Sequence, residues 1–157
     1  MNRMKLISRL EEIFVSVLLV VLVLFTFVNV LLRYVFQYSI SGSVEFSILL
    51  FAWIIFVGTS MAVKSGSHIK INLIESFLSE KSKQITTMAI SLLILMISLY
   101  MSIHGFIYSY KVVGETLGST NIPKVFVYLS FPVGFILSSV HLLHYFIIIF
   151  SGKGEES

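Results

Sequence analysis

Four histidines are the residues of this sequence whose chemistry could hold a cofactor. His104, His141 and His144 lie within long apolar segments, and His68 follows another. Two histidines that face each other across a helix bundle can ligate a haem iron. Antiparallel helices would place His104 near one end of the pair and His141 and His144 near the other, which disfavours a site between them. A haem held by His68 and a histidine of the last segment, in a membrane anchor of a redox complex, is one alternative; hydrogen bonding between helices is the more ordinary one.

A second group of candidate residues flanks the connection after the first apolar segment. Arg33 and the adjacent Tyr34 have the composition of an interfacial anchor, although Arg33 could also pair with Glu45 or with a partner subunit. Asn29 lies one helical turn before Arg33, and its amide in lipid favours adhesion to another helix over ligand binding. Trp53 falls near the middle of its segment, so its indole N–H requires an acceptor from protein.

Enzyme chemistry has no support in this sequence. There is no cysteine, and no phosphate-binding loop, dinucleotide fingerprint, metal cluster or nucleophilic triad is found. We therefore assign no catalytic, cofactor-binding or metal-binding residue. All eight acidic residues lie outside the four apolar cores, which disfavours a carrier that works alone, such as a small multidrug exporter with a carboxylate in an early helix.

The composition is that of an integral membrane protein. Hydrophobic residues make up 57% of the chain and charged residues 12%, with a mean hydropathy of +0.97, whereas soluble domains carry about 25% charged residues. The continuous apolar runs do not alternate as the strands of a barrel would, so helices are expected. We predict an all-α membrane protein, a single domain over residues 1–157 with four transmembrane helices at about 13–36, 44–64, 84–110 and 123–150.

The first apolar segment could also be read as a cleavable signal peptide. Arg3, Lys5 and Arg9 form a positive region ahead of it. Its apolar run is too long for a signal peptide, however, and no small-residue cleavage site follows. Ser8 with Glu11 fits a capping box that begins a helix. We therefore expect this segment to be retained as the first transmembrane helix.

The distribution of Lys and Arg predicts the orientation. With four spans, both termini and the middle connection share one side, which holds eight of the eleven basic residues, and the other side holds three. Positive residues favour the cytoplasmic face, so both termini are expected in the cytoplasm. Basic residues beside apolar runs serve this role more commonly than nucleic-acid binding, and no nucleic-acid partner is expected.

The middle connection and two helices carry further patterns. Residues 67–81 have one apolar and one polar helical face, which predicts a short amphipathic helix on the cytoplasmic surface of the membrane. Small residues recur at every fourth position, which allows close helix contact. Pro132 should free a carbonyl and bend the last helix. The two small-residue stripes are Gly58, Ala62 and Gly66, and Ser130, Gly134 and Ser138.

Together these marks resemble the small membrane subunit, the DctQ-like component, of tripartite ATP-independent periplasmic (TRAP) transporters. The resemblance extends over essentially the whole chain. Asn72 stands where the family often has aspartate, and the stretch before Glu45 lacks an expected tryptophan. The residues that carry the resemblance are Asn29, Arg33, Tyr34, Phe36, Glu45, Gly58, Ala62, Gly66, His68, Ile69, Ile122, Pro123, Phe131, Pro132, Val133 and Gly134.

The resemblance implies a role in secondary transport of organic acids, of the C4-dicarboxylate or sialic acid class, across a bacterial inner membrane. A periplasmic binding protein would deliver the solute, and a large membrane subunit would move it with a sodium gradient. The small subunit would scaffold the large one and need no cofactor of its own. We expect its first two helices and the surface helix to contact the large subunit.

Overall fold

A computed structural model of the chain describes residues 2–64, 80–118 and 120–150. Its long helices are α1 (Asn2–Val35), α2 (Ser43–Lys64), α4 (Glu80–Lys111) and α6 (Ser130–Phe150), and the short α5 (Val125–Tyr128) precedes α6. Four stretches are long and apolar enough to cross a membrane, at Met4–Val35, Ser43–Lys64, Ile85–Lys111 and Val125–Ile147. The expected all-α membrane fold with four spans is confirmed. The predicted surface helix at 67–81 lies almost wholly outside the described residues.

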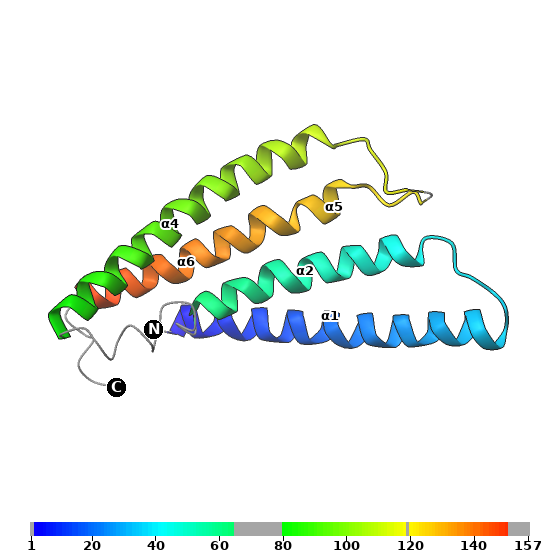
Figure 1. Ribbon diagram of the computed structural model, residues 1–157, viewed down its shortest axis with the longest axis horizontal. Coiled ribbons are helices and arrows are strands. Elements are labelled where there is room, and N and C mark those ends of the chain that lie inside the picture. The colour runs from blue at the N-terminus through cyan, green and yellow to red at the C-terminus, as the bar shows by residue number, and fades with distance from the viewer. Residues whose placement is uncertain (1, 65–79, 119, 151–157) are drawn as a thin grey trace.

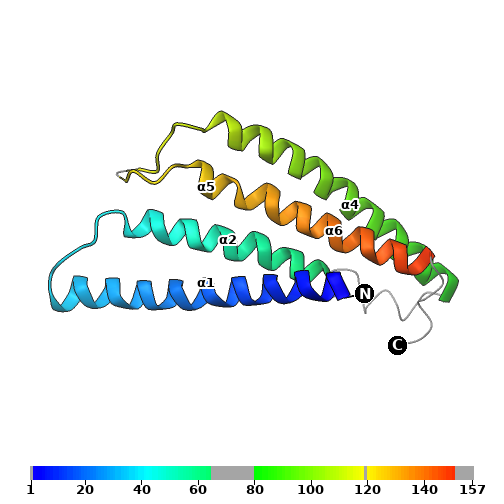
Figure 2. The same cartoon turned by 180° about the vertical axis from the view of Figure 1, so that it is seen from behind.

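The four long helices lie side by side in a row, in the order α1, α2, α6, α4 (Figures 1 and 2). Neighbours in the row are packed against each other, so α2 and α6 form the middle and α1 and α4 the two edges. One end of the row, here termed the loop end, holds the connections 36–42 and 112–124. The opposite end, termed the terminal end, holds Asn2, Lys64, Glu80 and Phe150 (Figure 1).

Small polar residues form the seam between α4 and α6. Ser91, Ser98, Ser102 and Ser109 recur along α4 at spacings of seven and four residues, and all are buried. Most of their hydroxyls with a known partner bond within their own helix; Ser91, for example, donates to the Thr87 carbonyl at 2.7 Å. Because lipid is as apolar as leucine, membrane helices adhere through such small residues, which let backbones approach closely.

The last span is interrupted at Leu129, between α5 and α6. Pro132 has no N–H to donate to the carbonyl of Tyr128 one turn earlier. Leu129 nevertheless keeps a helical conformation, with φ −66° and ψ −25°, so the two helices continue as one span from Val125 to Ile147. Pro132 thus follows a one-residue interruption of the span and lies beside the contact with α4, where Ser102 Oγ donates to the Pro132 carbonyl at 3.4 Å.

Candidate functional site

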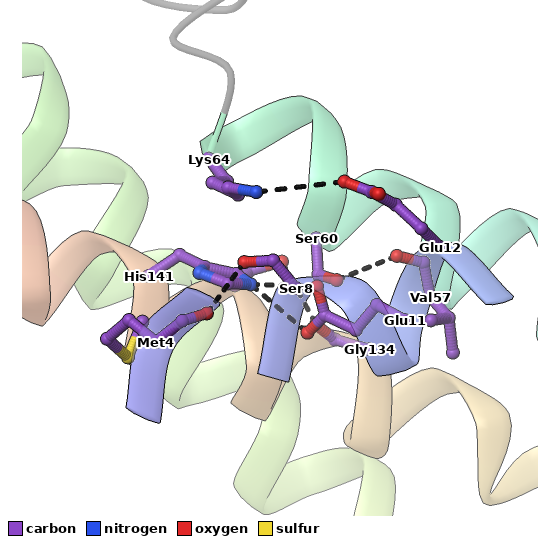
Figure 3. A network of polar contacts seen from close by, with 10 residues as sticks. Met4, Ser8, Glu11, Glu12, Val57, Ser60, Lys64, Gly134 and His141 are labelled. Carbon is purple, nitrogen blue, oxygen red and sulfur yellow. Dashed lines mark hydrogen bonds and ion pairs between the residues drawn. The ribbon is translucent and has the colours of Figure 1, made fainter. Parts of the chain in front are cut away.

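A buried acid–base pair joins α1 to α6 near the terminal end (Figure 3). His141 Nε2 lies 2.9 Å from Glu11 Oε2 and 3.1 Å from Oε1, and the two side chains are 2% and 5% exposed. Ser60 of α2 is fully buried close by, with its hydroxyl donating to the Val57 carbonyl at 2.7 Å. The pair thus ties the edge helix to the middle of the row.

One sequence prediction fails at this position. Glu11 lies just outside the predicted apolar core, yet it is buried. The capping box of Ser8 and Glu11 is wrong, because α1 begins at Asn2 and Ser8 Oγ donates to the Met4 carbonyl at 2.9 Å, as it does inside a helix. Arg and Lys are good helix formers, so α1 extends back through Arg9, Lys5 and Arg3 and does not begin at Ser8.

The Glu11–His141 pair is suited to holding helices together rather than to moving a solute. Both Glu11 oxygens face the same imidazole nitrogen, so the carboxylate is already engaged. The neighbouring ion pair, Lys64 with Glu12, is longer at 3.8 Å and solvent-exposed on both sides. Among the described residues, no cluster of three or more His, Asp or Glu could hold a metal ion.

Trp53 finds its acceptor inside the chain. Its indole Nε1 donates to the Phe126 carbonyl of α5 at 3.0 Å, and its ring meets Phe14 of α1 edge-on at 5.9 Å between centroids. Trp53 therefore connects α2 to helices on both of its sides. The contact therefore lies within the chain. Its acceptor, Phe126, lies two residues before the end of α5, where the interruption at Leu129 begins.

Of the candidate residues at the loop end, Glu45 contacts another part of the chain, whereas Arg33 and Tyr34 are exposed. Glu45, in the first turn of α2, lies so close to Gly118 that a Cβ there would be 2.5 Å from Glu45 Oε1. Gly118 has φ +45°, a region that glycine tolerates best. Arg33 and Tyr34 are exposed in the last turn of α1, and Arg33 makes no ion pair within the described residues.

Asn29 has a polar atom without a partner. Its Oδ1 is buried and accepts no hydrogen bond from the described part of the chain. One turn away, Phe25 packs edge-on against Phe46 of α2 at 4.7 Å, so this stretch of α1 is held against α2 by aromatic contact. The expected interhelical hydrogen bond of Asn29 is not formed through this oxygen by the described residues.

The two small-residue stripes differ in what they meet. Gly134 of α6 is in close contact with α2, because a Cβ there would lie 2.4 Å from the Phe56 carbonyl oxygen; Ser130 and Ser138 beside it are buried. A Cβ on Gly58 of α2 would meet nothing within 4 Å. Ala62 lies one turn further along α2 and is half-buried. The α6 stripe is used within the chain, while α2 is open at Gly58.

The candidate residues do not converge on one site. Asn29, Arg33, Tyr34 and Glu45 lie at the loop half, Trp53 and Gly58 lie in the middle of α2, and His68 is outside the described residues. His104 packs beside Tyr100 with 4.3 Å between ring centroids, in the loop half of α4, whereas His141 lies towards the terminal end of the neighbouring α6. Sequence reasoning missed the Glu11–His141 pair and the α4 serine seam. The seven-residue spacing of those serines was the available signal.

The fold and these contacts define a helical membrane subunit whose buried polar groups mostly fasten its own helices. The family described as "Tripartite ATP-independent periplasmic transporters, DctQ component" matches residues 22–151. The chain therefore belongs to this family, as a small permease subunit of a TRAP transporter. This is a family of transporter components and not of enzymes, and membership implies a complex with a large membrane subunit and a periplasmic binding protein.

Two relatives show the extent of the similarity. The C4-dicarboxylate TRAP transporter small permease protein DctQ of Vibrio cholerae is 34% identical over 65 residues, which is 41% of this chain and only 28% of the relative. The ectoine TRAP transporter small permease protein TeaB of Halomonas elongata is 27% identical over 141 residues, 88% of this chain and 72% of the relative. The chain is thus similar to small permeases that are named for different solutes, a C4-dicarboxylate and ectoine.

Proposed function

We propose that this subunit scaffolds the large membrane subunit of a TRAP transporter for sodium-coupled uptake of organic acids. The observation that carries this proposal is the buried Glu11–His141 pair, with His141 Nε2 2.9 Å from Glu11 Oε2. Intramembrane ionisable groups mark ion and solute pathways when they line a cavity. Here the buried acid and base engage each other, so they fasten α1 to the row and leave sodium coupling to the large subunit.

The shape of the subunit supports a bracing role. A row of helices widens an assembly in the membrane plane, whereas an enclosed carrier needs helices around a central site. Many of the large hydrophobic side chains of α1 are exposed, and none of the residues in its most apolar window is buried within the chain. An apolar surface of this extent requires lipid or a partner helix to cover it.

The contact surface we propose is the edge made by α1 and the open side of α2, extended by the segment 67–81. Gly58 would let a partner helix approach the α2 backbone, because nothing of this chain occupies its Cβ direction. The amide of Asn29, whose Oδ1 is buried against this chain without a hydrogen-bond partner among the described residues, would turn outward to bond the same partner. Arg33 and Tyr34, exposed at the end of α1, would contact the large subunit or the head groups around it.

We place the terminal end of the row in the cytoplasm and the loop end in the periplasm. Eight basic residues belong to the terminal side and three to the loop side, in agreement with the positive-inside rule. The loop end would then face the periplasmic binding protein. The solute is proposed to be an organic acid of the C4-dicarboxylate or sialic acid class, and a carrier in the large subunit would select it.

Affinity purification from mild detergent tests the assignment. The tagged subunit is expected to purify with one large permease in a constant ratio, and with no haem absorption. Uptake in proteoliposomes should require both membrane subunits, the binding protein and a sodium gradient. A coloured complex with redox subunits, or uptake unchanged when this subunit is omitted, would contradict the proposal.

A further inference from the structure

A groove opens between α2, α4 and the α5–α6 span in the loop half of the row. Its volume is about 580 Å³, within the range of small-ligand sites. Apolar side chains form its walls, and Gly105 lies at its floor, where a Cβ would be 2.6 Å from the Phe131 ring. The residues that matter for the argument are Ala52, Phe56, Met101, Tyr108, Lys111 and Phe131.

The lysine of the groove lies at one end, and His104 is a second polar group part-way along the α4 wall. Lys111 is the last residue of α4, and the Tyr108 ring beside it meets Tyr128 of α5 edge-on at 5.1 Å. Met101 lies ten residues earlier, about 15 Å along the helix at 1.5 Å per residue. A bilayer core is roughly 30 Å thick. The groove therefore runs from the membrane boundary at the loop end through about the depth of one leaflet.

Lys111 is a cation without a counter-charge in the described chain. The other lysine at this end, Lys124, is bonded to Glu115 at 2.7 Å, and this hydrogen bond raises the pKa of Lys124. Lys111 makes no such ion pair among the described residues. An ammonium and two tyrosines at the head of an apolar groove complement a molecule with an anionic head and a hydrocarbon tail.

We propose that this groove is a binding site for one phospholipid of the leaflet at the loop end. The phosphate lies on the Lys111 ammonium, with Tyr108 beside it. One acyl chain lies along Phe56, Met101 and Phe131 and fills the groove between α2, α4 and the α5–α6 span. The bound lipid thus acts as a packing element of the small subunit on the α4 side of the row, away from the proposed contact edge.

The test compares phospholipid retained by purified complexes. Complexes are washed in lipid-free detergent, and the remaining phospholipid is quantified by mass spectrometry. Lys111→Gln should lower retention about fivefold, the effect of one basic residue near an anionic head group, and Ala52→Trp should lower it further by filling the groove. Lys124→Gln and Ile55→Trp serve as controls, because neither position lines the groove, and both should retain lipid as the unchanged complex does.

A second measurement does not depend on the folding of any variant. The unchanged complex is reconstituted in vesicles with a phospholipid that carries a photoreactive group in its acyl chain. Adducts should concentrate on Met101 and Phe131 over Leu93, an exposed residue of α4 that does not line the groove and lies away from the proposed contact edge. Equal labelling of both surfaces, equal retention by Lys111→Gln, or cross-links from the groove to the large subunit would overturn the proposal.

Discussion

Helix α6 lies in the middle of the row and α1 at its edge, and the residues of each helix reflect its position. The window of α6 that would span the membrane is 39% buried within the chain, and that of α1 is 0% buried. Serines and glycine line α6 where it meets α2 and α4, while α1 presents Leu, Val and Phe around most of its circumference. Small residues therefore line much of the internal contact, beside a small buried cluster of Val63, Leu95 and Leu142, while most large apolar residues of α1 face outward.

The edge helix is consequently held by few contacts. Its identified side-chain links to the row are Phe25 against Phe46, Phe14 against Trp53, the buried Glu11–His141 pair and the exposed Glu12–Lys64 pair. The middle helix is instead held along its length. This contrast explains how one subunit can be firmly folded on one side and adaptable to a partner on the other, and substitutions in the two regions should separate these properties.

The largest effect is expected from Glu11→Ala. It leaves His141 buried without its carboxylate, and removing one partner of a buried pair costs about 3–5 kcal/mol. Unfolding in mixed detergent micelles measures the loss, and Glu12→Ala, at an exposed carboxylate, should have almost no effect. Replacing both Glu11 and His141 by leucine should recover most of the stability, because no buried polar group is then left unpaired. No recovery in the double variant would contradict this explanation.

Gly134→Ala should cause the next largest loss of stability. The new methyl group would lie 2.4 Å from the Phe56 carbonyl oxygen, so α2 and α6 must move apart, and overpacking of this kind costs about 1–3 kcal/mol. Gly58→Ala is the matched control, because its methyl group enters open space. We expect the control to leave the isolated subunit stable while weakening co-purification with the large subunit. Equal stability losses at both glycines would show that the middle and open sides of α2 do not differ.

Trp53→Phe removes one hydrogen bond and keeps an aromatic ring against Phe14. The Phe126 carbonyl loses its indole donor, for an expected cost of about 1 kcal/mol. Tryptophan fluorescence is lost in this variant, so circular dichroism is the suitable probe of unfolding. Phe51→Leu, at an exposed position of the same helix, should be neutral. A neutral Trp53→Phe would mean that the link from α2 to α5 adds nothing to stability.

Glu115→Gln should have the smallest effect. The Lys124–Glu115 pair is exposed, and solvent screens such pairs. The hydrogen bond to Glu115 raises the pKa of Lys124, so the stabilisation is complete below the ordinary value of 10.5 and is lost as pH rises through the raised pKa. Hydrogen exchange of residues 112–118 and 120–124 at neutral pH should increase slightly, with α1 and α2 unchanged. A global loss of protection would contradict this ranking.

The sequence allowed the elements to be predicted, and packing decided how they are arranged. Four charge-free runs predict four spans because lipid requires helical backbone, whereas the prediction for Pro132 was a bend and did not specify the interruption at Leu129. The order of helices in the row depends on which small-residue faces meet, and one chain gives no sign of that choice. Glu11 and His141 are 130 residues apart. Their pairing could not be predicted without knowing the order of the helices in the row. The predicted capping box failed because the basic start of the chain continued the helix.

Cross-linking from matched positions on the two edges tests the central proposal most directly. Val20 of α1 and Ile103 of α4 are 57% and 60% exposed, so a photoreactive residue at either would be equally accessible in the isolated subunit. If α1 and α2 form the contact edge, the residue at Val20 will cross-link to the large subunit in intact cells and that at Ile103 will not. Cross-links from Ile103 alone would place the large subunit on the α4 edge and contradict the proposal.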